Sequence, residues 1–91
     1  MKTSKQVEKH IKGIANHRRI DILLLVSDSS GITLDNIAKA LSCNFKTISG
    51  HASKLVNAGL IDKNYNGPQV LHSLSPYGKI FVKFLKEFKK L

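Results

Sequence analysis

Apolar residues recur at helical spacing through most of the chain, and the pattern changes to alternation only after residue 59. Apolar side chains three or four residues apart share one face of a helix, whereas alternation is typical of a half-buried strand. The spacing therefore predicts four helices before this change and a fifth after it. We expect them at about Ser4–Ala15, from a cap at Asn16 to Ser27, from a cap at Thr33 to Leu41, from a cap at Asn44 to Asn57, and from Pro76 onward.

Residues that start and stop helices stand at these boundaries. The side-chain oxygens of Thr33, Asn44 and Ser75 can each accept a hydrogen bond from a free backbone N–H of a first helical turn. Pro76 follows Ser75 at the first helical position, where its missing N–H costs nothing. Gly59 stands where a left-handed residue ends the fourth helix.

The alternating segment predicts a β-hairpin. Leu60–Tyr65 and Val70–Leu74 are the expected strands, and Asn66–Gln69 is the expected turn. The order is then α-α-α-α-β-β-α, which is mainly α with a small β-hairpin wing. Two short helices joined by a three-residue turn, followed by a glycine and a hairpin, predict a winged helix-turn-helix. Residues 1–91 are expected to form one such domain, because 91 residues support a single modest core.

Composition excludes several classes of protein. No apolar run approaches the roughly 20 residues that span a bilayer, and charged residues follow the N-terminus, unlike a signal peptide. Cys43 is the only cysteine, which suits a reducing compartment, so we expect a cytoplasmic protein with no membrane association. No catalytic set of Ser, His, Asp or Cys and no phosphate-binding glycine loop stands in a usable context, so we do not expect an enzyme.

The charge indicates an anionic partner. Fifteen Lys and Arg against six Asp and Glu leave a net charge of +9, concentrated at both ends of the chain. Residues 1–19 hold six basic side chains against one acidic, and residues 76–91 hold five against one. Nucleic acid is the first candidate for such a partner and an anionic membrane surface the second.

Three segments resemble the ArsR-type repressors. They are ANHRRIDILLLV (Ala15–Val26), LDNIAKALSCNFKTISGHASKLVNAGLI (Leu34–Ile61) and LHSLSPYGK (Leu71–Lys79), the last of which also resembles MarR- and PadR-like proteins. The resemblance covers nearly the whole chain. It implies a sequence-specific regulator of transcription that binds double-stranded DNA and acts as a repressor.

The fourth helix carries the candidate DNA-binding residues. A helix fits the major groove, and residues near its N-terminus meet base edges and phosphates. Lys46 could reach guanine or phosphate, and Phe45 could pack on a thymine methyl group. An alternative remains for each: a solvated lysine, a buried Phe45, or a His51 bonded only within the fold. The candidates, with two from the wing, are Asn44, Phe45, Lys46, Thr47, Ser49, Gly50, His51, Lys54, Asn66 and Gln69.

Two departures from the family weaken direct base reading. Gly50 stands where relatives often carry Arg or Gln, and the wing tip lacks the Arg that often enters the minor groove. More affinity must then come from phosphates and duplex shape. The positions of the family's metal-binding cysteine pair are occupied by Thr33 and Asp35, so we expect no metal or other cofactor. Cys43 is interpreted as a half-buried turn residue, and a redox switch is the alternative.

Apolar residues at both ends predict a homodimer. On the last helix they are spaced 4,3,4,3, as at a helix–helix interface, and the first helix offers a matching stripe. The alternative is that these two helices pack on each other within one chain. The expected interface comprises Val7, Ile11, Ile14, Tyr77, Phe81, Phe84, Phe88 and Leu91. A two-fold dimer would read a pseudo-palindromic operator with half-sites roughly 34–36 Å apart.

A second class of function is kept open. A winged helix could instead serve as a protein–protein interaction module with weak or nonspecific affinity for nucleic acid. Gly50 and the uncharged wing favour that alternative, whereas the capped, polar-faced fourth helix favours DNA.

Overall fold

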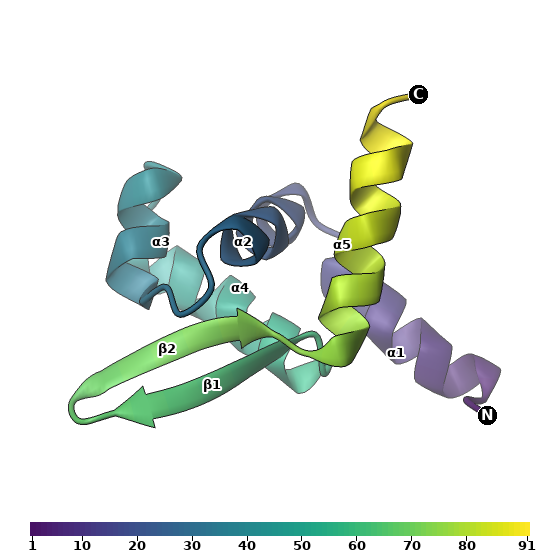
Figure 1. The fold of residues 1–91 in the computed structure, drawn as a ribbon, viewed down its shortest axis with the longest axis horizontal. Helices are drawn as coiled ribbons and strands as arrows, with labels where there is room; N and C mark the ends of the chain where they lie inside the picture. Colours follow the sequence, from purple (N-terminus) through teal and green to yellow (C-terminus); the bar gives the residue numbers. More distant parts are fainter.

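The computed structural model describes residues 1–91 and contains five helices and one hairpin (Figure 1). All seven predicted elements are present, and most of their ends agree with the sequence analysis within one or two residues. The elements are α1 (Ser4–Ile14), α2 (His17–Asp28), α3 (Leu34–Ala40), α4 (Phe45–Asn57), β1 (Ile61–Asn66), β2 (Gln69–Leu74) and α5 (Pro76–Lys89).

Side-chain caps fix where the helices begin. The Asn16 side chain accepts from the N–H groups of Arg18 and Arg19, and the Ser75 hydroxyl accepts from Gly78 N–H at 3.0 Å. The predicted caps are therefore confirmed. One further cap was not predicted from the sequence: Thr3 caps α1 in a reciprocal pair with Gln6. Gly59 ends α4 in the left-handed region, with φ of +76°, as predicted.

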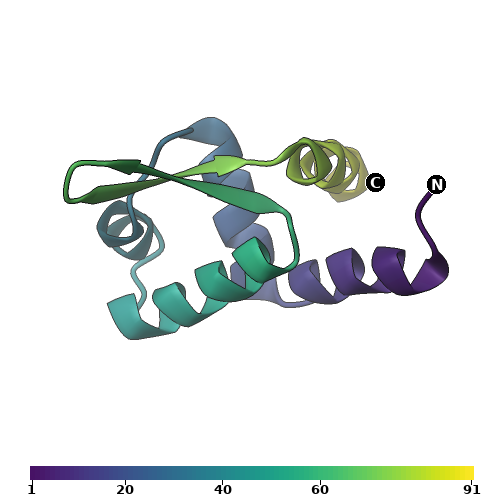
Figure 2. The same ribbon diagram turned by 90° about the horizontal axis from the view of Figure 1, so that it is seen from below.

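The core is built around α2. Ile22, Leu23 and Val26 are completely buried, and α2 contacts α1, α4, α5 and β2. Figure 2 shows α4 and α1 along one side of the molecule, the hairpin and α5 along the other, and α2 running between them. This arrangement leaves the far side of α4 without a covering element.

Two glycines allow backbone segments to approach closely. A methyl group on Gly78 would collide with the backbone carbonyl oxygen of Leu60, and one on Gly13 would collide with the Ala58 methyl group. The first contact sets the start of α5 against the segment that follows α4. The second sets the end of α1 against the end of α4. Both positions therefore require glycine for packing rather than for an unusual backbone angle.

The base of the wing is anchored and its tip is free. β1 and β2 pair antiparallel from Ile61↔Leu74 to Asn66↔Gln69, so only Gly67 and Pro68 form the turn and the predicted four-residue turn is too long. The backbone N–H and the ring Nδ1 of His72 both donate to the Ile32 carbonyl at 3.0 Å, and the His72 carbonyl accepts from Gly31 N–H at 2.8 Å. His72 is buried, whereas residues 62–69 are all exposed. The hairpin is thus held to the α2–α3 connection at one end only.

The start of α5 lies beside the second half of α1, and from there the two helices diverge, at the end of the molecule opposite the wing tip (Figure 1). His10 of α1 links them, because its ring lies 4.9 Å from that of Tyr77 while its Nδ1 lies 2.6 Å from the Ala58 carbonyl oxygen. No helix has the length and apolar character needed to cross a membrane.

Candidate nucleic-acid interface

One face of α4 is held in the core, and this orients the opposite face outward. Ile48, Ala52 and Leu55 are buried, as the sequence predicts. Most of the candidate residues on this helix are exposed, and Ser49 and His51 are half-buried. We call residues 44–54 on the uncovered side the α4 surface. It carries two lysines and no carboxylate.

The first turn of α4 is fixed by Asn44. Its side-chain oxygen accepts from Lys46 N–H at 2.8 Å and from Thr47 N–H at 3.3 Å. That oxygen is therefore engaged in capping, and only the amide NH₂ group of Asn44 remains to donate. The cap holds Lys46 and Thr47 in a defined position at the N-terminal end of the α4 surface.

Gly50 has no structural role within the chain. A Cβ atom placed on it would meet no heavy atom within 4 Å, and its backbone angles are helical. A glycine at the middle of a helix lowers stability by about 1 kcal/mol relative to alanine. Nothing inside the protein compensates for this cost, in contrast to Gly13 and Gly78.

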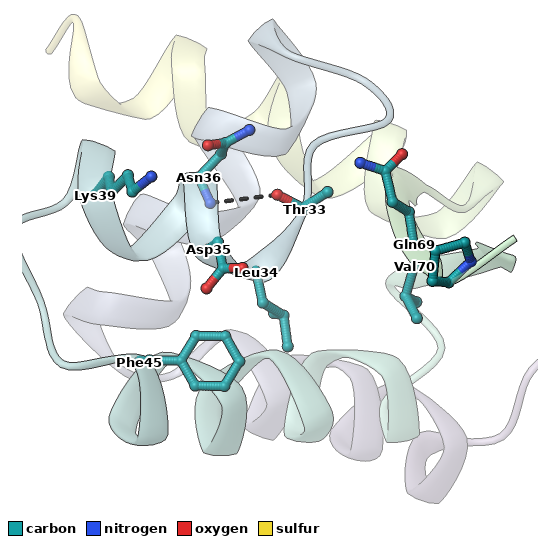
Figure 3. A pocket seen from close by; sticks show the side chains of 9 residues that line it. Thr33, Leu34, Asp35, Asn36, Lys39, Phe45, Gln69 and Val70 are labelled. Atoms are coloured by element: carbon teal, nitrogen blue, oxygen red, sulfur yellow. Dashed lines mark hydrogen bonds between the residues drawn. The ribbon is translucent and has the colours of Figure 1, made fainter. Parts of the chain in front are cut away.

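A groove separates the start of α3 from the wing (Figure 3). Its volume is about 450 Å³. Phe45 lies in this groove with 49% of its surface exposed, so the alternative that it is a buried cap residue is wrong. Of the two candidate wing residues, Gln69 lines the groove and Asn66 does not. The lining residues are Thr33, Leu34, Asp35, Asn36, Lys39, Phe45, Pro68, Gln69 and Val70.

His51 stands in a positively charged environment. Its Nδ1 atom is buried and has no hydrogen-bond partner, which removes the alternative that a bond within the fold explains this residue. Burial lowers the pKa of His51, and the positive charge of Arg19 lowers this pKa further, followed by smaller effects from Lys54, His17 and Arg18. The side chain is therefore held in its neutral form near neutral pH.

Three of these neighbours were missed by the sequence analysis. His17, Arg18 and Arg19 begin α2, and the fold brings them to the α4 surface although more than 30 residues separate them from His51. The only signal in the sequence was the basic charge of residues 1–19. Charge in a segment does not show which element of the fold that segment faces.

Metal-ligating side chains do not gather in the structure. No three His, Cys, Asp or Glu residues come together as a metal site would require. Thr33 accepts from Asn36 N–H at 3.3 Å as the cap of α3. Cys43 is half-buried in the turn between α3 and α4, as interpreted from the sequence.

The predicted dimer residues divide into two groups. Phe84 and Phe88 stack at 5.6 Å and are 55% and 61% exposed, and Val7, Ile11, Tyr77 and Leu91 are exposed as well. Ile14 is different: it is only 8% exposed and belongs to the core, so its assignment to the interface is wrong. Phe81 is half-buried against the core. The two terminal helices do not cover each other's apolar faces.

Two adjacent helices, α3 and α4, with a four-residue connection (41–44) between them and a hairpin after them, define a winged helix-turn-helix fold. No protein-family model matches the sequence, and no curated protein matches it. Solved structures nevertheless share the fold. HlyU from Vibrio cholerae is 22% identical with a TM-score of 0.86 over 97% of this chain and 96% of that chain.

Two further structures extend this likeness. The homodimeric winged helix-turn-helix DNA-binding domain Mb0332 from Mycobacterium bovis, a possible ArsR-family regulator, is 23% identical with a TM-score of 0.85 over 94% of this chain and 80% of that chain. Streptococcus pneumoniae FabT in complex with DNA is 15% identical with a TM-score of 0.76 over 92% and 65%. The winged helix-turn-helix predicted from the sequence is thereby confirmed.

Proposed function

We propose that this protein binds double-stranded DNA in a sequence-specific manner and regulates transcription as a repressor, in the cytoplasm and without a metal sensor. The observation that carries the proposal is the α4 surface, which is uncovered, capped at Asn44 and free of carboxylates. A helix presented in this way fits the major groove. FabT, which shares the fold, was solved in complex with DNA.

The α4 surface supplies few groups that read bases. Thr47 and Ser49 can bond to base edges or phosphates, and Lys46 can reach guanine. Gly50 lets the helix backbone approach the duplex, since the protein itself leaves that space empty. Lys54, Asn66 and Gln69 bind the phosphate backbone on either side. Affinity therefore comes mainly from phosphates and duplex shape.

A second copy of the chain covers the apolar faces of α1 and α5. Large aromatic side chains left exposed on a small domain are costly, and pairing removes them from water. Mb0332, a homodimer, has the same fold. The dimer presents two α4 surfaces to a pseudo-palindromic operator with half-sites roughly 34–36 Å apart. Repression follows because a bound dimer occupies promoter DNA.

Selection from random duplex oligonucleotides tests the proposal directly, because it examines specificity and half-site symmetry together. Binding of the selected duplex should then weaken with salt, with a slope near −0.9 per phosphate contacted in a plot of log K against log salt. Lys54→Ala should lower this slope by about 1.8, because each subunit of the dimer loses one phosphate contact, whereas Lys83→Ala on α5 should leave it unchanged. Recovery of no enriched sequence, with little affinity at ~150 mM salt, would instead indicate a protein-interaction module.

A further inference from the structure

Basic side chains from two helices gather beside the α4 surface without a carboxylate among them. His17, Arg18 and Arg19 come from the start of α2, and His51 and Lys54 come from α4. Besides burial, the other four side chains all lower the pKa of His51, Arg19 most of the four, and no carboxylate is among the causes of this shift. The two ion pairs of the structure, Lys12–Glu8 and Lys86–Asp28, involve none of these five residues. We call this set the α2–α4 basic cluster.

Two polar atoms of the cluster are buried and unpartnered. They are Nε of Arg19 and Nδ1 of His51, one from each helix. A buried polar group without a hydrogen-bond partner lowers the stability of the folded protein. The positive charge of Arg19 would in addition repel a protonated His51. The backbone N–H groups of Arg18 and Arg19 are not free to bind an anion, because the Asn16 side chain already accepts from both. Because protein covers the two unpartnered atoms themselves, an incoming anion would be held by the side chains that reach the surface: Lys54 and His17 are exposed, and Arg18 and Arg19 are half-buried.

We infer that the α2–α4 basic cluster binds a backbone phosphate of the DNA and that His51 takes up a proton when it does so. This inference rests on the proposed function, because it adds a second contact segment, on α2, to the duplex bound by α4. A phosphate is the suited ligand because its charge offsets several cations at once and its oxygens accept from guanidinium groups. The contact is made to the sugar-phosphate chain beside the groove that α4 enters, so it carries no base specificity.

The proton follows from the charges around His51. In the free protein burial opposes a positive imidazole, and so do Arg19, His17 and Arg18 of α2 and Lys54 of α4. A bound phosphate places negative charge beside His51 and so raises its pKa. Between the pKa of His51 in the free protein and its pKa in the complex, the complex therefore holds more protons than the free protein. Affinity for DNA therefore rises as the pH falls through the histidine range.

Fluorescence anisotropy with the selected duplex and with an unrelated duplex tests both parts. Arg18→Gln should weaken binding about tenfold per subunit on both duplexes and lower the salt slope of the dimer by about 1.8, since a phosphate contact is independent of sequence. Lys83→Gln, which removes one charge on the distant α5, should change neither value. Unaltered affinity and slope in Arg18→Gln would overturn the phosphate contact.

The proton uptake is tested with a separate variant, His51→Gln. From about pH 8 to about pH 6, the wild-type protein should bind more tightly and with a steeper salt slope, a measurement that needs no substitution. His51→Gln should abolish most of this pH dependence while the variant remains folded by circular dichroism. A pH dependence retained in His51→Gln, or absent in the wild type, would overturn the role of His51. If the wild type binds no duplex at all, the proposed function itself is wrong. If it binds DNA but neither Arg18→Gln nor a change of pH alters the affinity, only the inference about the α2–α4 basic cluster is wrong.

Discussion

Replacing Gly50 by alanine should stabilise the protein and weaken its binding to DNA. The added methyl group enters open space, since no heavy atom lies within 4 Å of the new Cβ position. The change therefore brings only the helix propensity of alanine, which is about 0.8–1 kcal/mol better than that of glycine. For a domain of this size that gain corresponds to a rise in Tm of roughly 4–8 °C.

Binding should change in the opposite direction, because the methyl group would occupy the space through which the α4 backbone approaches the duplex. We expect a loss of about tenfold or more, comparable to one lost base-edge interaction. Asn57→Ala is the matched control: it lies exposed at the end of the same helix, outside the α4 surface, and should change stability by at most about 0.5 kcal/mol with little effect on affinity.

Thermal unfolding by circular dichroism and anisotropy titration of the selected duplex measure the two effects of Gly50→Ala. Stabilisation without any loss of affinity would refute the idea that Gly50 serves a close approach to DNA. Destabilisation would refute the description of residue 50 as a free helical position.

Three other outcomes are expected. Gly78→Ala, the same substitution in another helix, should lower the free energy of unfolding by about 3 kcal/mol or more, because its methyl group would collide with the Leu60 carbonyl. Urea titrations measure this loss, and a variant as stable as the wild type would contradict the contact. Phe84→Asp should yield monomers on a sizing column and weaken operator binding, and an unchanged dimer would show that the interface lies elsewhere. The free protein should lose stability as the pH falls through about 7 to 6, because the lowered pKa of His51 makes the unfolded chain bind more protons than the folded one. The urea midpoint of His51→Gln should therefore depend less on pH than that of the wild type. An equal pH dependence in the two proteins would exclude His51 as the cause.

The elements of this fold could be predicted because their signals are local. Thr33, Asn44 and Ser75 each cap a helix through an N–H two or three residues away, so the chain around each cap contains what is needed. The change of period after Gly59 is equally local and identified the wing. The missed cap at Thr3 was available in the same way, from the Gln three residues later.

Features that depend on packing between distant segments could not be predicted. Ile14 shares the apolar stripe of Val7 and Ile11, but the close approach of Gly13 to Ala58 draws the end of α1 into the core. A stripe shows that a face is buried, not what buries it. The effect of the Arg19 charge on His51 likewise depends on how α2 packs against α4, which no spacing in the sequence specifies.

The one-sided anchoring of the wing has a consequence for engineering. Because β2 is fastened at His72 and residues 62–69 contribute nothing to the core, the tip can be lengthened or exchanged at small cost to folding. Segments grafted between Lys63 and Pro68, such as an arginine-bearing loop, would alter which duplexes are preferred while the helices stay as they are. The hairpin end is therefore the natural place to retarget this scaffold.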